Sequence, residues 1–369
     1  MSTTSMSTTS VSAAESAAAA RPRAFRPFRR GGPVLVASVL LALTAACGSS
    51  TPEAGGSAPS SASSAKPAGG AYPVTISNCD RTLTFDHAPK RVVSLAQPQT
   101  DVVVDLGLVD RVVGQAQLGV VDGLAGSAEP EGSENIPVIA KSGVPAKEVT
   151  VSQSPDLVLA PTTYEFDGEQ GFATMKDLEA ADIAPYLAAG GCPERRIHRS
   201  VKDTLVDLDS LGQIFGVQDR AKELASDYTG QLDEVADALQ GTKPVKVAEV
   251  YIWGSDIQSL VGSTENDLVR AAGGVNVFAP GDPQFKGMLF ANLSAEVVAA
   301  TQPEAFVFSA GSEKEADQVR ATLRKTFPST PAVRNDKLIA YSSSASLPGS
   351  MTTPAAVRYV AEQLHPDAF

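Results

Sequence analysis

One short phrase occurs twice in this chain, once in each half. EVTVSQSPDLVLA begins at Glu148, and EVVAATQPEAFVF begins at Glu296. In both copies the Glu stands seven residues before a Pro, which is followed by an acidic residue and an apolar run. The apolar run has the length of a buried strand, and the residues before the Pro have the spacing of a short helix. The repetition predicts that one helix and strand unit is used in each of two halves.

Strands and helices alternate around both copies. After a hairpin at 74–85, the first half has strands predicted at 91–95, 111–114 and 156–161, with helices at 101–107 and 146–153. The second half has strands predicted at 245–252, 304–309 and 337–342, with helices at 267–274, 313–326 and 353–365. Such alternation is typical of an α/β fold whose parallel sheets are covered by helices.

A long helix is predicted between the two halves. Apolar residues recur at three- and four-residue spacing from Ala221 to Leu239, and the pattern stops at Gly241. A helix of about 20 residues is ~30 Å long, so the segment 219–241 is expected to be a rigid connector. It would join an N-terminal lobe, 72–218, to a C-terminal lobe, 242–369.

The first 71 residues are not expected to belong to the fold. Five Arg precede the apolar run Pro33–Ala46, which falls short of the ~20 residues that span a bilayer. Residues 1–46 therefore indicate a cleaved export signal, with a membrane anchor helix as the alternative. The sequence LTAAC resembles the lipobox of bacterial lipoproteins, which implies a lipid on Cys47. Residues 47–71, rich in Gly, Ser and Pro, indicate a flexible tether.

Composition limits the kinds of partner and predicts the state of two cysteines. A net charge of −12 argues against nucleic acid as a partner. With Cys47 lipidated, Cys79 and Cys192 are an even pair in an oxidising compartment, and they are expected to form a disulfide. Two unrelated thiols are the alternative.

The body of the chain resembles a known family. The segments that carry the likeness are NCDRTLTFDHAPKRVVSLAQPQTDVVVDLGLVDRVVG, PDLVLAPTTY, NDLVRAAGGVNVF and LSAEVVAATQPEAFV. Over nearly all of 72–369 the chain is similar to the substrate-binding lipoproteins of ABC importers for ferric siderophores, cobalamin and haem. The resemblance implies two Rossmann-like lobes with parallel sheets, one rigid connecting helix, and a ligand cleft between the lobes. It also implies a monomer at the extracytoplasmic face of the cell membrane, held there only by its lipid.

The resemblance assigns roles to both repeated Glu residues. Glu148 and Glu296 match the positions through which the family docks on its ABC transporter permease. The alternative is that each Glu only favours the N-terminus of its helix. For ligand binding, the loops that follow strands are expected to present a set of polar and aromatic residues: Gln97, Gln99, Thr163, Tyr164, Trp253, Phe285 and Lys286. Trp253 fits a core position equally well, and Phe285 and Lys286 fit a mobile loop equally well.

The ligand is expected to be a small-molecule iron chelate. Three scattered His give no cluster for a metal bound directly by protein, so no metal site or cofactor is predicted and iron would arrive chelated. Few Arg stand in the expected cleft loops, apart from Arg195 and Arg196 nearby, which favours a ferric hydroxamate over an anionic catecholate. Cobalamin and haem remain alternatives within the family.

The sequence offers little for other classes of function. The sequence has neither a G-x-S-x-G elbow nor a P-loop, and six residues between Cys192 and His198 do not show a nucleophile pair. An enzyme is therefore not expected. An adhesion or signalling lipoprotein that uses the same lobes as a scaffold is the alternative from another class.

Overall fold

The structure, a computed structural model, describes residues 72–369 except 119–122, 128–129, 196, 254–255, 279–281 and 286. The predicted export signal, Cys47, the tether and Lys286 lie outside the described residues, as does the side chain of Trp253. Among the described helices, none is both long enough and apolar enough to cross a bilayer.

The N-terminal lobe contains a parallel sheet. Its five strands are β3 (Val92–Ser94), β4 (Val112–Ala116), β5 (Val138–Ala140), β6 (Leu157–Ala160) and β7 (Ala184–Leu187). They lie in the order β5-β4-β3-β6-β7, and every neighbouring pair is parallel. The antiparallel hairpin of β1 (Val74–Asn78) and β2 (Arg81–Phe85) precedes this sheet. The lobe's helices are α1 (Gln97–Asp105), α2 (Lys147–Ser152), α3 (Met175–Glu179) and α4 (Thr204–Phe215).

The C-terminal lobe contains a mixed sheet. Its strands are β8 (Val245–Trp253), β9 (Asp256–Leu260), β10 (Gly274–Asn276), β11 (Phe290–Asn292), β12 (Ala305–Ala310) and β13 (Leu338–Ser342). The order is β11-β9-β8-β12-β13, and β10 also pairs with β8. Strands β8, β10, β12 and β13 are parallel, as predicted, whereas β9 is antiparallel to both β8 and β11. Only two residues separate β8 from β9, and so short a connection can join only antiparallel strands.

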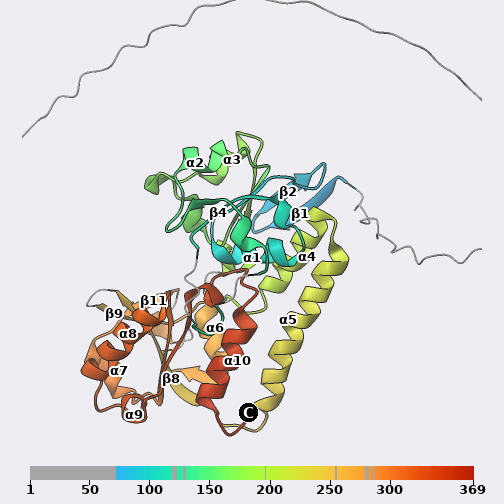
Figure 1. The fold of residues 1–369 in the computed structure, drawn as a ribbon. Coiled ribbons are helices and arrows are strands. Elements are labelled where there is room, and N and C mark those ends of the chain that lie inside the picture. Colours follow the sequence, from blue (N-terminus) through green and yellow to red (C-terminus); the bar gives the residue numbers. More distant parts are fainter. Residues whose placement is uncertain are drawn as a thin grey trace, which may run out of the picture. The chain divides into compact units, whose positions relative to one another are not determined.

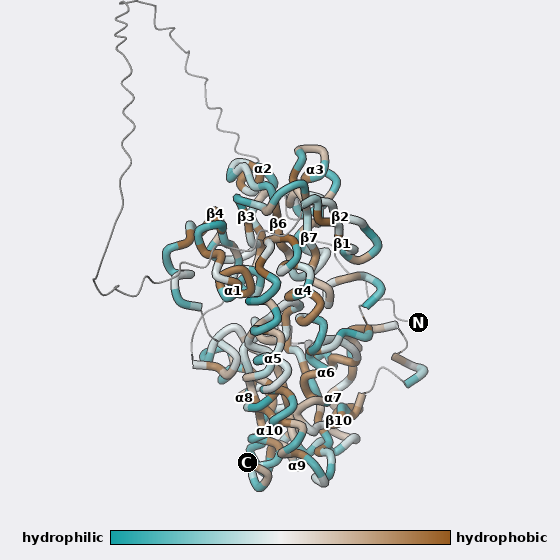
Figure 2. Tube along the Cα trace, turned by 90° about the vertical axis from the view of Figure 1, so that its right-hand side faces the viewer, coloured by the Kyte–Doolittle hydropathy of each residue, from teal (hydrophilic) through white to brown (hydrophobic). Residues whose placement is uncertain are grey.

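Helices cover both sheets. Those of the C-terminal lobe are α6 (Thr264–Ala271), α7 (Ala295–Ala300), α8 (Glu313–Thr326), α9 (Pro331–Arg334) and α10 (Thr353–Leu364). Short 3-10 turns are η1 (Val109–Arg111), η2 (Ser133–Asn135), η3 (Thr163–Phe166), η4 (Gly168–Gln170), η5 (Ala189–Gly191), η6 (Pro193–Arg195), η7 (Pro283–Phe285) and η8 (Ser343–Ser346). The central strand β6 is hydrophobic along its length, and β3 is buried along its length, as strands covered on both faces should be (Figure 2).

The expected long helix is α5 (Gln218–Ala238), which runs alongside both lobes (Figure 1). Its 21 residues correspond to about 30 Å of helix. Ala221 and Leu224, in its first half, belong to the N-terminal core. Tyr228 and Val235, further along, belong to the C-terminal core. One continuous helix therefore contributes to both hydrophobic cores.

A second connection between the lobes was not predicted. Residues 123–127 lie between β4 and β5 in the chain, but they pack on the C-terminal lobe. Leu124 is buried in that lobe's core, and the carbonyl of Ala125 accepts a hydrogen bond from Ser342 N at 2.9 Å. Gly126 has a φ of +81°, and a Cβ at this position would lie 2.6 Å from Ala345 Cβ. We call residues 123–127 the strap.

Candidate functional site

A cavity of about 800 Å³ lies between the lobes. Both lobes line it, through the following residues: Thr162, Thr163, Tyr164, Asp167, Gly191, Pro193, Arg199, Leu260, Ser263, Glu265, Leu289 and Phe290. Its volume is within the range of small-molecule sites, and it receives residues that directly follow β6 and β9. Another cavity, of about 430 Å³, lies beside α5 and the end of α6, away from these strand ends. We take the larger, interlobe cavity as the candidate ligand cleft.

The wall from the N-terminal lobe is a capped turn after β6. Thr162 Oγ1 donates to Glu165 Oε2 at 2.7 Å and accepts from Tyr164 N at 3.2 Å. Burial raises the pKa of the Glu165 carboxyl. This local network fixes the turn, so that Thr163 and Tyr164 line the cleft. The side chain of Tyr164 is 54% exposed and packs edge-on against Phe172, with 5.6 Å between ring centroids.

The opposite wall comes from the antiparallel pair of strands β9 and β11 and from the start of α6. Phe290, on β11, is 46% exposed, and its ring centroid lies 6.0 Å from that of Tyr251. Glu265 lies in the first turn of α6 and is half-buried. Neither residue was predicted: Phe290 lies on an antiparallel strand that was not recognised in the sequence, and Glu265 lies in the first turn of a helix, where an acid ordinarily serves that helix. The apolar residues around Phe290 and the short turn after β8 were the available signal.

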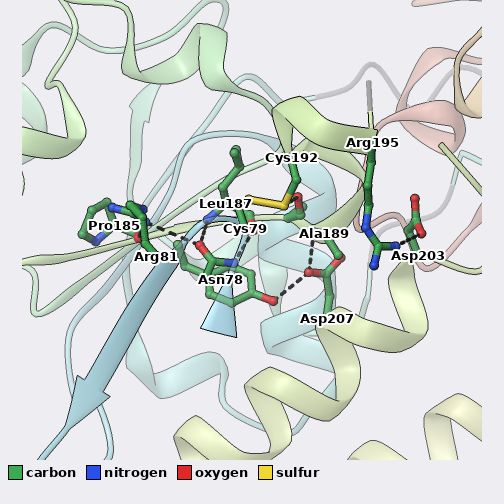
Figure 3. The surroundings of a disulfide bond; sticks show 12 residues. Asn78, Cys79, Arg81, Pro185, Leu187, Ala189, Cys192, Arg195, Asp203 and Asp207 are labelled. Atoms are coloured by element: carbon green, nitrogen blue, oxygen red, sulfur yellow. Dashed lines mark hydrogen bonds and ion pairs between the residues drawn. A yellow bond between two sulfur atoms is a disulfide. The ribbon is translucent and has the colours of Figure 1, made fainter. Parts of the chain in front are cut away.

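The third side of the cleft depends on the predicted disulfide. Cys79 and Cys192 are joined, which ties the turn at 189–195 to the end of β1 (Figure 3). Asn78 strengthens this link, since its side chain donates to Leu187 O at 2.7 Å and accepts from Leu187 N at 3.0 Å. Gly191 lies so close to the backbone that an added Cβ would be 2.0 Å from Pro161 O. Only glycine fits at this point of the cleft wall.

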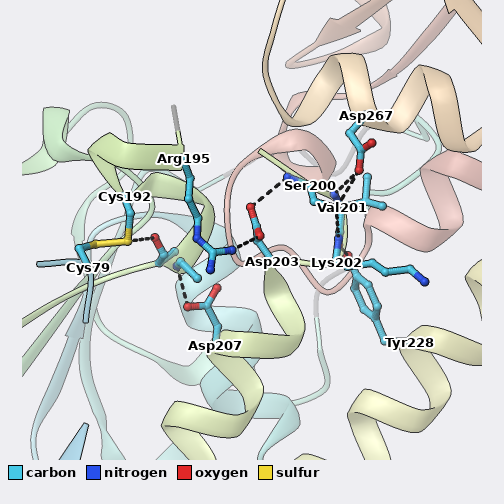
Figure 4. Close-up of polar contacts among 12 residues, drawn as sticks. Cys79, Cys192, Arg195, Ser200, Val201, Lys202, Asp203, Asp207, Tyr228 and Asp267 are labelled. Carbon is cyan, nitrogen blue, oxygen red and sulfur yellow. Dashed lines mark hydrogen bonds and ion pairs between the residues drawn. A yellow bond between two sulfur atoms is a disulfide. The ribbon is translucent and has the colours of Figure 1, made fainter. Parts of the chain in front are cut away.

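The segment after this turn is held by one acid from each lobe. Asp203 accepts from Ser200 N at 2.9 Å and forms an ion pair with Arg195 (Figure 4). Asp267, on α6 of the other lobe, accepts from Ser200 Oγ and from Val201 N, each at 2.9 Å. The position of this chain crossing is thus set by carboxylates from both lobes.

Asp207, on α4, is the most perturbed acid of this region. Its Oδ1 accepts from Tyr186 OH at 2.7 Å and from Ala189 N at 2.8 Å (Figure 3). Burial, above all, raises the pKa of Asp207 to about 7, partly offset by these two hydrogen bonds. Its Oδ2 and Oε1 of Gln99 have no partner among the described residues, and both side chains line a cavity of about 10 Å³, room for about one water.

Three of the predicted ligand-binding residues are not brought to this cleft. Gln97 and Gln99 begin α1 and are buried, with Nε2 of Gln97 bonded to Asp101 Oδ1 at 2.7 Å and Nε2 of Gln99 bonded to Pro348 O at 2.9 Å. Phe285 is buried against Phe278 in the C-terminal core. The contact of Gln99 with Pro348 joins residues far apart in the sequence and leaves no local signal. Ligand contact by Thr163 and Tyr164 stays a prediction, although both line the cleft.

The two repeated Glu residues occupy equivalent positions. Glu148 and Glu296 are exposed, and each is the second residue of a six-residue helix, α2 or α7, on the side of its lobe away from α5 (Figure 1). Each is followed by an exposed valine, Val149 at 38% and Val297 at 48%. Ser294 caps α7, and its hydrogen bond lowers the pKa of Glu296. A docking role for either Glu stays a prediction.

Comparison with known proteins places the chain in a family. The periplasmic binding protein family matches residues 92–345. A cobalamin-binding protein of Halobacterium salinarum is 25% identical over 268 residues, covering 72% of this chain and 65% of that protein, so the match spans slightly less than two thirds of the relative's length. Among solved structures, a periplasmic binding protein from Veillonella parvula has a TM-score of 0.68 at 18% identity, covering 79% of this chain and 97% of that one. A protein described as an ABC-type Fe³⁺-hydroxamate transport system from Saccharomonospora viridis has a TM-score of 0.62 at 22% identity, covering 79% and 99%.

At these identities the solved structures establish the fold, two α/β lobes, and the family match covers most of the chain. The chain belongs to the periplasmic binding protein family.

Proposed function

We propose that this protein captures a ferric hydroxamate siderophore outside the cytoplasm and delivers it to the permease of an ABC importer. The observation that supports this most directly is the interlobe cleft of about 800 Å³, with an aromatic side chain exposed on each lobe, Tyr164 and Phe290. Aromatic faces and hydroxyl groups suit the apolar backbone and hydroxamate oxygens of such a chelate. Arg199 is the one cation among the described lining residues, which is too few for a highly anionic catecholate complex.

Cobalamin is the second candidate ligand. The Halobacterium relative is described as a cobalamin-binding protein, and residues of both lobes line the cleft, which suits a ligand held between two lobes. Haem is a third ligand of the same family, but haem carries two carboxylates, and the described lining offers two acids against one Arg. The hydroxamate proposal follows from the balance of charge and from the exposed aromatic rings.

Calorimetric titration of the purified protein would test the ligand. A ferric trihydroxamate and its gallium analogue should both bind saturably, because recognition acts on the chelate and not on the redox-active metal. Binding of cobalamin or haem in place of both hydroxamate complexes would overturn the proposal.

Delivery would occur at a membrane face. We propose that a lipid on Cys47 and the tether at 47–71 hold the folded body there, and that Glu148 and Glu296 contact basic pockets of the permease. Replacing both Glu by Lys should abolish uptake while leaving the affinity for ligand unchanged, since neither residue lines the cleft. A loss of affinity in the double variant would exclude the docking role.

A further inference from the structure

The charges inside the cleft are unevenly compensated. Two carboxylates line it, Asp167 from the N-terminal lobe and Glu265 from the C-terminal lobe. Asp167 is engaged locally, since its Oδ1 accepts a hydrogen bond from Glu169 N at 2.9 Å. Glu265 is different: among the described residues its carboxylate has neither a hydrogen bond nor an ion pair. Glu265 is thus a half-buried carboxylate in a ligand cavity without a direct ion pair among the described residues, and Arg199 is the one cation of the described lining.

Two buried groups that respond to the charge of Glu265 do not compensate it. Glu249, at the centre of β8, is completely buried, and its Oε1 has no partner among the described residues. Burial raises the pKa of Glu249 well above its usual range, and the charge of Glu265 raises it further. The hydroxyl of Tyr341 on β13 is also buried and has no hydrogen-bond partner within the described part of the chain, and its pKa is raised by burial and then by the charges of Glu265 and Glu249. The two groups on β8 and β13 whose pKa values respond to Glu265 are thus acidic oxygen groups, and neither is a cation.

The remaining neighbour in the first turn of α6 is already paired. Asp267 forms an ion pair with Arg270 at 2.5 Å and accepts the hydrogen bonds from Ser200 and Val201 described above. Glu265 lies in the first turn of α6, and the N-terminus of this helix supplies no cation that a ligand would have to displace. The negative charge of Glu265 is therefore available to a molecule in the cleft.

A carboxylate in this setting discriminates between ligands by charge. When a ligand fills the cleft, it removes water from Glu265, and this desolvation is unfavourable unless the ligand brings a hydrogen-bond donor. An ammonium group would form a charge-assisted hydrogen bond, whereas a neutral amide would gain less and a carboxylate would be repelled. We propose that Glu265 recognises a positively charged group on the ligand, so that the preferred chelate is a ferric trihydroxamate that carries a free ammonium.

This inference rests on the proposed function, and a matched pair of ligands separates the two. The first probe is a linear ferric trihydroxamate with a terminal amine, and the second is the same complex with that amine acetylated. The iron centre is neutral in both, because three hydroxamates balance Fe³⁺, so the probes differ essentially by one ammonium charge. By calorimetry at low salt, the ammonium form should bind the native protein about tenfold to a hundredfold more tightly than the acetylated form.

The variant Glu265→Gln keeps the shape of the side chain and removes its charge. It should lose the preference for the ammonium form while binding the acetylated form as the native protein does. Asp227→Asn makes the same change of charge on the exposed face of α5, outside the cleft lining, and should keep the full preference. Circular dichroism of both variants would show that the fold is intact.

Three results would overturn the inference, and they differ in whether the proposed hydroxamate function survives. Equal affinity of the native protein for both probes would refute charge recognition but leave the hydroxamate function standing. A preference that persists in Glu265→Gln would show that another group recognises the ammonium. Failure of both probes to bind would refute the proposed ligand class and this inference with it.

Discussion

Replacing Asp207 by Asn should make the protein more stable at neutral and alkaline pH. In the native protein the pKa of Asp207 is about 7, compared with 3.8 for an unperturbed Asp, because the carboxyl is fully buried. The folded state therefore holds this proton more tightly than the unfolded state does. The resulting stabilisation is fully present below pH ~4 and is lost as the pH rises towards 7. Above pH 7 the folded protein carries a buried negative charge.

The magnitude follows from the size of the pKa shift. At 1.36 kcal/mol per unit, a shift of about three units corresponds to roughly 4 kcal/mol of lost unfolding free energy between pH 4 and pH 8. Asn keeps the oxygen that accepts from Tyr186 OH and Ala189 N. Its new NH₂ group also places a donor in the cavity that holds Gln99 Oε1, an atom without a partner among the described residues. The variant should therefore avoid the charge without losing the hydrogen bonds.

Urea unfolding of native protein and Asp207→Asn at pH 4, 5, 6, 7 and 8 would measure this difference. The two unfolding free energies should agree within about 1 kcal/mol at pH 4 and diverge with rising pH to a few kcal/mol at pH 8, the variant being the more stable. Asp209→Asn, an exposed change on the same helix, should follow the native curve at every pH. If native protein and Asp207→Asn gave parallel curves, the buried carboxyl would not titrate in this range and the reasoning would be wrong.

Three further changes test the parts that fix the lobes and the cleft wall. Gly126→Ala should lower the unfolding free energy by about 2–4 kcal/mol, because the left-handed φ is strained for alanine and the new methyl meets Ala345; a thermal melt unchanged from native would contradict the packing of the strap. The double change Cys79→Ala and Cys192→Ala should destabilise by up to about 4–5 kcal/mol on the chain-entropy estimate, and a reductant should shift the native protein but not the variant in denaturant titrations. Asp267→Ala leaves the backbone amide of Val201 unpaired at the chain crossing, so the unfolding free energy should fall by about 1–3 kcal/mol and hydrogen exchange at 200–202 should become faster. Unchanged exchange at these residues would argue against the role of Asp267.

Much of the fold could be predicted from local patterns. The apolar run after Pro155 and its repeat after Pro303 became β6 and β12, and the spacing from Ala221 onwards became α5. Strand β9 was missed because DIQSL has too few apolar residues to identify a strand by itself. It is a strand because β8 and β11 pair with it on either side. Such pairing involves distant residues and cannot be predicted from the sequence of one segment.

Residues of the candidate site could be predicted only where a position just after a strand places the side chain at the ligand-binding edge of the sheet. Thr163 and Tyr164 line the cleft because they follow a strand at the edge where parallel sheets bind ligands. Gln99 follows β3 in an equivalent way, but its side-chain amide donates a hydrogen bond to Pro348 O, far away in the sequence. Glu265 was overlooked because an acid in the first turn of a helix ordinarily serves that helix. Its significance depends on Glu249 and Tyr341, which only the folded chain brings near it.

The course of α5 through both cores bears on how the protein folds and unfolds. Leu224 completes the apolar layer of one lobe, while Leu232 and Val235 on the same helix pack with Val357 and Val360 of α10 in the other. Loosening the C-terminal layer would fray the helix towards its first half and withdraw support from the N-terminal layer. The two lobes should consequently melt in a single calorimetric transition, and a chain that lacked α10 would leave half of α5 as an apolar stripe open to aggregation.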